Sequence, residues 1–152
     1  MKLPNLDRSR APADLVDALW AVRRTNDTSR RDEVALLATH EDGIVRQEAL
    51  SLLLTKWRDI DFRPLAMEMV QSDEDVAVRS RAALGIASVS STETRAADVA
   101  LLRGILLDSD EDVEVRRSCY EALSLIDGRK PPPLNADFDF GRDVELEWVR
   151  RM

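Results

Sequence analysis

Few side chains in this sequence could carry out catalysis. It contains one histidine, His40, and one cysteine, Cys119. A nucleophilic pair needs a serine or cysteine beside a histidine base, and His40 has no such neighbour in the chain. A tetrahedral zinc site draws its ligands mainly from cysteine and histidine, so one residue of each does not supply one. These two residues therefore predict neither nucleophilic catalysis nor a zinc centre.

An acidic run later in the chain has part of the pattern of a calcium loop. Asp108, Asp110 and Asp112 have the alternating spacing with which such a loop opens. The sixth position requires glycine and is Val113, and the twelfth requires glutamate and is Cys119. Glycine-rich phosphate loops are also missing from the sequence. We therefore expect no bound metal, no cofactor and no enzymatic activity.

The composition narrows the class of protein further. The 152 residues carry 22 Lys and Arg against 29 Asp and Glu, a net charge of −7 that disfavours nucleic acid as a partner. A hydrophobic share of 44% suffices for one folded domain, whereas every apolar run is far shorter than the ~18 residues that span a bilayer. Residues 1–7 lack the apolar core of a signal peptide, and the single cysteine fits a reducing compartment. We expect a cytoplasmic protein that does not contact membranes.

Internal repeats indicate how the chain is organised. Residues 72–79, Ser-Asp-Glu-Asp-Val-Ala-Val-Arg, recur 37 positions later with a single change as residues 109–116, and a weaker copy lies at residues 40–46. A small residue follows each arginine by three positions and an aliphatic residue follows it by seven. These residues are Ala49, Ala82 and Cys119, and Leu53, Ile86 and Leu123. A period of this length that holds two helices is typical of a helical solenoid.

Apolar residues spaced three and four apart predict helices and no strands before residue 130. The expected helices span residues 13–24, 44–57, 62–70, 76–89, 96–107 and 113–126, and a further helix is entered near Ser29 and contains Val34, Leu37 and Ala38. The links between them are short and rich in Asp, Ser and Thr. We therefore predict an all-α fold of antiparallel helix pairs, with residues 13–128 as its body and residues 1–12 as a flexible arm.

The acidic turn, the Val-Arg pair and the small and aliphatic residues after it resemble the second helix of HEAT-like repeats. The resemblance covers about residues 29–128 as three repeats, with residues 13–24 as a possible N-terminal capping helix. It implies a short right-handed α-solenoid whose second helices line a concave surface. The first copy departs from the pattern because Gly43 stands where the others have Val76 and Val113.

The turn acids and the arginines predict a structural ladder. Asp75 and Asp112 are expected to cap the helices that follow them, and each arginine is expected to pair with turn acids of its own or the adjacent repeat. The predicted ladder comprises Asp42, Arg46, Asp75, Arg79, Asp112 and Arg116.

A face of the second helices opposite the buried stripe is unexpectedly apolar. Its residues are Gln47, Leu50, Ser51 and Leu54 in the first copy, Ser80, Leu84 and Ala87 in the second, and Arg117, Tyr120, Glu121 and Ser124 in the third. An idle solvated face would carry Lys, Glu or Gln, so we predict that this face binds a protein partner, with Tyr120 as its anchor. In the alternative, these side chains pack against neighbouring second helices or the C-terminal tail.

The tail begins with a proline-rich linker at residues 129–133. The apolar residues Val144, Trp148, Val149 and Met152 suit one face of a helix, although a strand is an alternative. An apolar tail of this kind is expected to pack on the last repeat as a cap; the alternative is a docking segment for another molecule.

Together these features predict a non-catalytic protein–protein interaction module that binds one protein partner through its concave face. The resemblance is to bacterial adaptors and immunity proteins, which inhibit a toxin by covering it, and the acidic charge would favour a basic partner. The alternatives are an enzyme or enzyme subunit of the HEAT-like lyase type and a homo-oligomeric structural subunit.

Overall fold

The computed structural model describes residues 5–131 and 139–152, which form helices and turns without any strand. The helices are α1 (Pro12–Thr25), α2 (Arg31–Leu37), α3 (Gly43–Leu50), α4 (Arg63–Ser72), α5 (Val76–Val89), α6 (Arg95–Leu107), α7 (Val113–Ile126), α8 (Phe140–Asp143) and α9 (Leu146–Arg151). A π-helical segment, Ser51–Lys56, continues α3. The predicted all-α fold is confirmed, and α5 and α7 begin and end at the expected residues.

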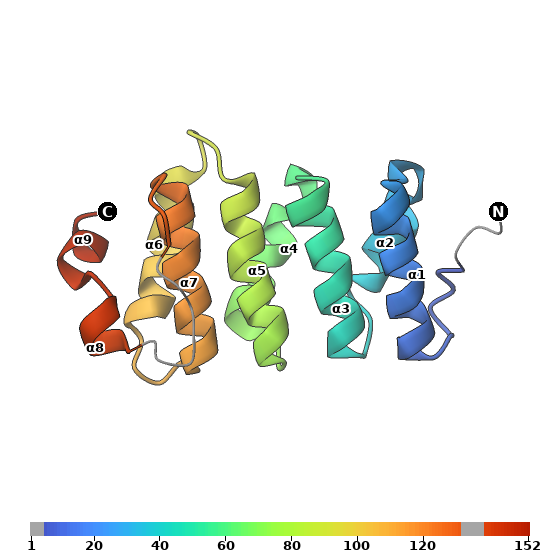
Figure 1. The fold of residues 1–152 in the computed structure, drawn as a ribbon, viewed down its shortest axis with the longest axis horizontal. Helices are drawn as coiled ribbons and strands as arrows, with labels where there is room; N and C mark the ends of the chain where they lie inside the picture. The colour runs from blue at the N-terminus through green and yellow to red at the C-terminus, as the bar shows by residue number, and fades with distance from the viewer. Residues whose placement is uncertain (1–4, 132–138) are drawn as a thin grey trace.

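The helices form two layers (Figure 1). Helices α1, α3, α5 and α7 stand side by side in one row, and α4 and α6 lie behind that row. The row therefore contains the second helix of each predicted repeat, with α1 as an additional member at the N-terminal end. The right-handed winding of the array stays a prediction. Within the described residues, every helix is too short or too polar to cross a bilayer.

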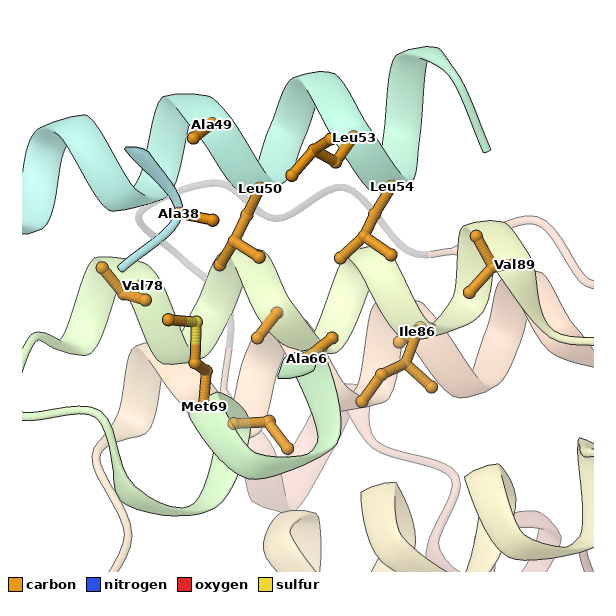
Figure 2. Packing of buried hydrophobic residues seen from close by; sticks show 14 of the residues in the cluster. Ala38, Ala49, Leu50, Leu53, Leu54, Ala66, Met69, Val78, Ile86 and Val89 are labelled. Atoms are coloured by element: carbon orange, nitrogen blue, oxygen red, sulfur yellow. The ribbon is translucent and has the colours of Figure 1, made fainter. Parts of the chain in front are cut away.

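The core lies where the neighbouring helices meet. Leu50, Leu52, Leu53 and Leu54 are all at most 1% exposed, and Leu50 and Leu54 point toward α5 (Figure 2). An interior helix with neighbours on several sides is apolar around most of its circumference. Burying each leucine stabilises the fold by roughly 1.5–3 kcal/mol.

Two glycines permit close approach between repeats. A Cβ atom at Gly85 of α5 would lie 2.7 Å from Leu54 Cδ1, so α3 and α5 meet at van der Waals distance only because Gly85 has no side chain. A Cβ atom at Gly43 would collide with the carboxylate of Asp75. The first repeat therefore carries Gly43, where the other repeats carry valine, because a side chain there would displace the Asp75 carboxylate.

The N-terminal arm is packed against the first repeat over the residues that the structure describes. Leu6 is 5% exposed, and the ring of His40 donates from Nε2 to the carbonyl oxygen of Arg8 at 3.2 Å. Part of residues 1–12 therefore contacts the first repeat, and the flexibility of the arm stays a prediction. The apolar side chain of Leu6 is buried beside the first repeat.

The C-terminal tail stands at the far end of the row as two short helices, α8 and α9 (Figure 1). Val144, at the break between them, and Val149 are buried. The rings of Tyr120 and Trp148 meet edge to face with centroids 5.8 Å apart. The predicted helix in the tail is confirmed, as two short helices, and the tail covers α7. Residues 132 and 133 of the proline-rich linker lie outside the described residues.

Gly85→Ala should lower the free energy of unfolding by about 1 kcal/mol, because forcing a methyl group against Leu54 outweighs the gain in helix propensity. Gly104→Ala is the matched control, since no atom lies within 4 Å of the position its Cβ would take. That control should stabilise the protein by about 0.5–1 kcal/mol. Urea denaturation followed by circular dichroism measures both changes. Stabilisation by both substitutions would contradict the tight contact between α3 and α5.

Candidate functional site

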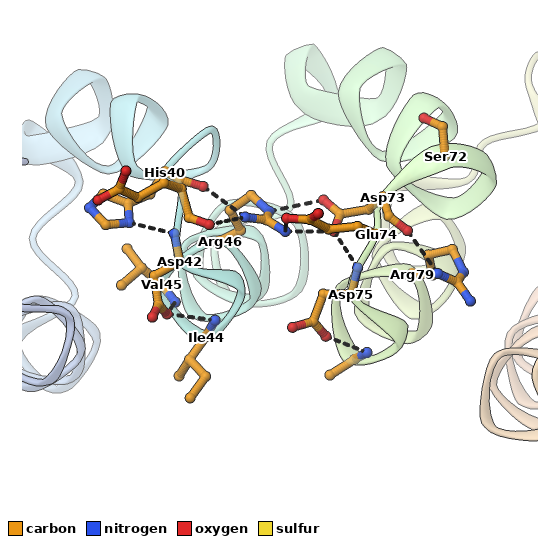
Figure 3. A network of polar contacts seen from close by, with 12 residues as sticks. His40, Asp42, Ile44, Val45, Arg46, Ser72, Asp73, Glu74, Asp75 and Arg79 are labelled. Carbon is orange, nitrogen blue, oxygen red and sulfur yellow. Dashed lines mark hydrogen bonds and ion pairs between the residues drawn. The ribbon is translucent and has the colours of Figure 1, made fainter.

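Asp75 and Asp112 cap their helices as predicted, and Asp42 caps α3 in the same way. Figure 3 shows the caps at Asp42 and Asp75. Asp42 Oδ1 accepts from the backbone N–H groups of Ile44 and Val45, at 2.9 and 3.2 Å. Asp75 accepts from the backbone of Ala77, and Asp112 accepts from the backbone of Glu114, both at 2.8 Å. Each cap satisfies an N–H group that a helix end leaves without a partner and contributes roughly 1 kcal/mol.

The arginines link adjacent repeats through other acids than the capping aspartates. Arg46 donates from Nε and Nη2 to the carboxylate of Asp73, at 2.9 and 2.7 Å, and both side chains are at most 9% exposed. Arg79 donates to Glu111 Oε1 at 3.0 Å and to the backbone oxygen of Asp73 at 2.7 Å. The predicted pairing with turn acids of the adjacent repeat is therefore confirmed for Arg46 and Arg79. Asp42, Asp75 and Asp112 take no part in these pairs, because their carboxylates accept from N–H groups of their own helices.

Arg116 belongs to the last repeat and has no following repeat to bind. Its Nε donates to the backbone oxygen of Leu106 at 2.9 Å, and its guanidinium lies 4.3 Å from the ring centroid of Phe140 in the tail. The expected acidic partner is therefore replaced by an aromatic ring. The tail supplies a cation–π contact where an interior repeat supplies a carboxylate.

Five of the predicted partner-binding residues are buried: Leu50, Ser51, Leu54, Tyr120 and Ser124. Their predicted exposure is wrong because the second helices touch one another directly and because the tail covers α7. The Tyr120 hydroxyl accepts from the backbone N–H of Glu145 in the tail, at 3.3 Å. Tyr120 is therefore a core residue and offers no anchor to a partner.

The other predicted residues stay partly accessible on the row of second helices. They are Gln47, Ser80, Leu84, Ala87, Arg117 and Glu121. Gln47, Ser80 and Leu84 line a cleft of about 470 Å³ over α5, which extends from α3 to α7. The structure therefore brings part of the predicted set together around α5.

Helix α1 adds an aromatic residue to this surface. Trp20 is 45% exposed, and the guanidinium of Arg23 lies over its ring. Arg23 also donates to the hydroxyl of Ser51, in the π-helical segment that continues α3, at 2.9 Å. A second hollow, of about 300 Å³, lies between Val16 of α1 and Ile44 of α3. We call the surface formed by Val16, Trp20, Gln47, Ser80, Arg81 and Leu84 the second-helix face.

Sequence reasoning missed Trp20 because α1 lacks the Asp-x-x-Val-Arg signature. A usable signal was nevertheless present. Ala18 and Val22 precede Ala49 and Leu53 by 31 positions, which extends the small and aliphatic pattern to α1. In that register Trp20 corresponds to Ser51. A repeat search that did not require the arginine would have placed α1 in the row of second helices.

The two residues that could have carried chemistry have structural roles. His40 is 4% exposed, with Nδ1 accepting from the backbone N–H of Asp42 and Nε2 donating to Arg8. Burial raises the pKa of the Cys119 thiol to about 12. Over the described ranges, no group of three or more His, Cys, Asp or Glu side chains is arranged to hold a metal ion.

Comparison with known families gave one match. The family model described as HEAT repeats matches residues 32–124. Neither the curated proteins nor the solved structures gave a match.

Asp73→Ala should reduce the free energy of unfolding by about 3–5 kcal/mol, because it leaves the Arg46 guanidinium buried without its carboxylate. Asp112→Ala removes only a helix cap and should cost about 1 kcal/mol. Chemical denaturation compares the two variants. Adding Arg46→Met to Asp73→Ala should recover part of the loss, and no recovery would argue against a buried unpaired charge.

Cys119 should not react with a thiol reagent at pH 8 in the folded protein, and it should react fully in denaturant. The pKa of the Cys119 thiol is about 12 in the folded protein and 9.0 for a free thiol. Burial of the protonated thiol therefore contributes its full share to the free energy of unfolding below pH 9. This contribution then falls as the pH rises toward 12, because only the unfolded state loses its proton in that range. Rapid labelling of the native protein at pH 8 would contradict the buried position.

Proposed function

Because the chain belongs to the HEAT-repeat family, we propose that it is a non-catalytic module that binds one protein partner through the second-helix face. HEAT repeats generally mediate protein–protein interaction. The observation that carries the proposal is Trp20, a large aromatic side chain left 45% exposed on α1, in the same row of helices as the two hollows.

The residue types of the face support this proposal. Tryptophan and arginine are the types most often found at the energetic centre of protein interfaces, and a hollow beside them lets a partner side chain exclude water. Trp20 supplies the aromatic group, Leu84 an aliphatic one and Arg81 a guanidinium. Gln47 and Ser80 add polar groups that can set the register of a bound chain.

The charge of the chain favours certain partners. A net charge of −7 attracts a basic protein over distances of about a Debye length, ~8 Å at physiological salt, and speeds the encounter. An inhibitor of the immunity type or an adaptor would both use such steering. The single thiol, buried at Cys119, suits a cytoplasmic setting.

Site-specific photo-crosslinking in the native cell tests the proposal. With p-benzoylphenylalanine at position 20, irradiation should give one adduct of defined mass. Position 36 is the matched control, because Leu36 is an apolar residue 63% exposed on α2, outside the row of second helices. Adducts at position 36 alone would contradict the proposed face, and an adduct of twice the chain mass would indicate self-association instead.

With the partner identified, Trp20→Ala should weaken its binding roughly 30-fold, the equivalent of about 2 kcal/mol. Leu36→Ala should leave the affinity unchanged. Titration calorimetry measures both, and thermal melting checks that each variant is folded. An unchanged affinity for Trp20→Ala would remove Trp20 from the interface.

A further inference from the structure

Buried polar atoms without a hydrogen-bond partner gather on α5. They include the Nε atoms of Arg79 and Arg81 and the Oγ atom of Ser80. The guanidinium atoms can only donate, and the serine hydroxyl can donate as well. A buried donor without an acceptor costs about 1–3 kcal/mol, so an acceptor supplied at these atoms would be stabilising.

Two of these residues, Ser80 and Arg81, line the cleft over α5. Its two acidic residues are already engaged: Asp75 caps its own helix, and Glu114 pairs with Arg117 at 2.9 Å. Arg81, by contrast, forms neither a hydrogen bond nor an ion pair within the described part of the chain.

Two neutral side chains in the cleft can also donate. Gln47, from α3, and Ser118, from α7, both line it, and neither side chain has a hydrogen-bond partner among the described residues. Val76 and Leu84 add apolar walls. The cleft therefore combines one available guanidinium, two neutral donors and an aliphatic surface.

We infer that the cleft over α5 binds a carboxylate side chain, Asp or Glu, carried on an aliphatic segment of the partner protein. The carboxylate accepts from the terminal nitrogens of Arg81, with Gln47 and Ser118 at its sides, and the neighbouring aliphatic residue packs on Leu84. The inference rests on the proposed function and specifies the chemistry of the bound segment.

A carboxylate fits this cleft better than a nucleic-acid backbone does. A chain of phosphates needs a row of cations, whereas the cleft offers one uncommitted arginine in a protein of net charge −7. One guanidinium binds one carboxylate in a planar, two-bonded arrangement. A local preference for an acidic side chain is compatible with a partner of net positive charge. The net charge acts over the whole approach of the two proteins, whereas the Arg81–carboxylate contact acts within a few ångströms.

Selection from a phage-displayed library of random peptides tests the inference without knowledge of the partner. Peptides enriched on the full chain should contain Asp or Glu next to Leu, Ile or Val. In the best peptide, replacing the acid by its amide should weaken binding 10-fold or more. Arg81→Gln should abolish this difference, and Arg81→Lys should retain part of it, since the charge remains but the planar pair is lost.

Arg103→Gln is the matched control. Arg103 is a half-buried arginine on α6, in the other layer of helices. Its substitution by glutamine removes the same charge as Arg81→Gln does. The control should leave the preference for acidic peptides intact, and thermal melting should show all three variants folded. Ser118→Ala tests a second residue of the cleft. It should weaken the binding of acidic peptides and leave the binding of their amide counterparts unchanged.

The possible results separate the inference from the proposed function. Enriched peptides that lose affinity with Trp20→Ala but lack an acidic residue would overturn the inference and leave the proposed face in place. Acidic peptides that bind Arg81→Gln as tightly as the unmodified chain would also overturn it. A library that yields no binder to the second-helix face would count against both.

Discussion

Direct packing of α3 against α5 is the contact on which the rest of the structure depends. Leu54 of the α3 segment fits against Gly85 of α5, where a Cβ atom would lie 2.7 Å from Leu54 Cδ1. The contact brings two second helices together without an intervening layer. It therefore buries positions that a helix pair standing alone would expose, while hollows over α5 and between α1 and α3 stay accessible.

Electrostatics extends this packing along the array. The buried pair of Arg46 and Asp73 ties the first repeat to the second, and the pair of Arg79 and Glu111 ties the second to the third. Each arginine also donates to backbone oxygens at the preceding turn, which fixes that turn beside its helix. At the last repeat the Phe140 ring takes the place of the next acid, so the tail completes a series that would otherwise end at an open guanidinium.

The same constraint explains why a functional surface remains at α5. The interior second helix contacts neighbours on both sides, and its remaining face carries Ser80, Arg81 and Leu84 at the floor of a cleft. At the N-terminal end α1 has a neighbour on one side only, so Trp20 keeps 45% of its surface exposed. The exposed Trp20 is thus at the N-terminal end of the row of helices, and the cleft over α5 is in its interior.

The sequence by itself determined the helices, the repeat and the caps, because these depend on local periodicity and on residues within one turn of each other. The bounds of α5 and α7 and the capping roles of Asp75 and Asp112 follow from such patterns. The tertiary structure alone decided which faces are exposed. A helical wheel identifies the side opposite the buried stripe, but whether a neighbouring helix covers that side depends on contacts between distant segments. Leu50, Leu54 and Tyr120 are core residues for that reason. The small and aliphatic residues of α1 indicate its place in the row, but only the structure shows that Trp20 is left exposed there.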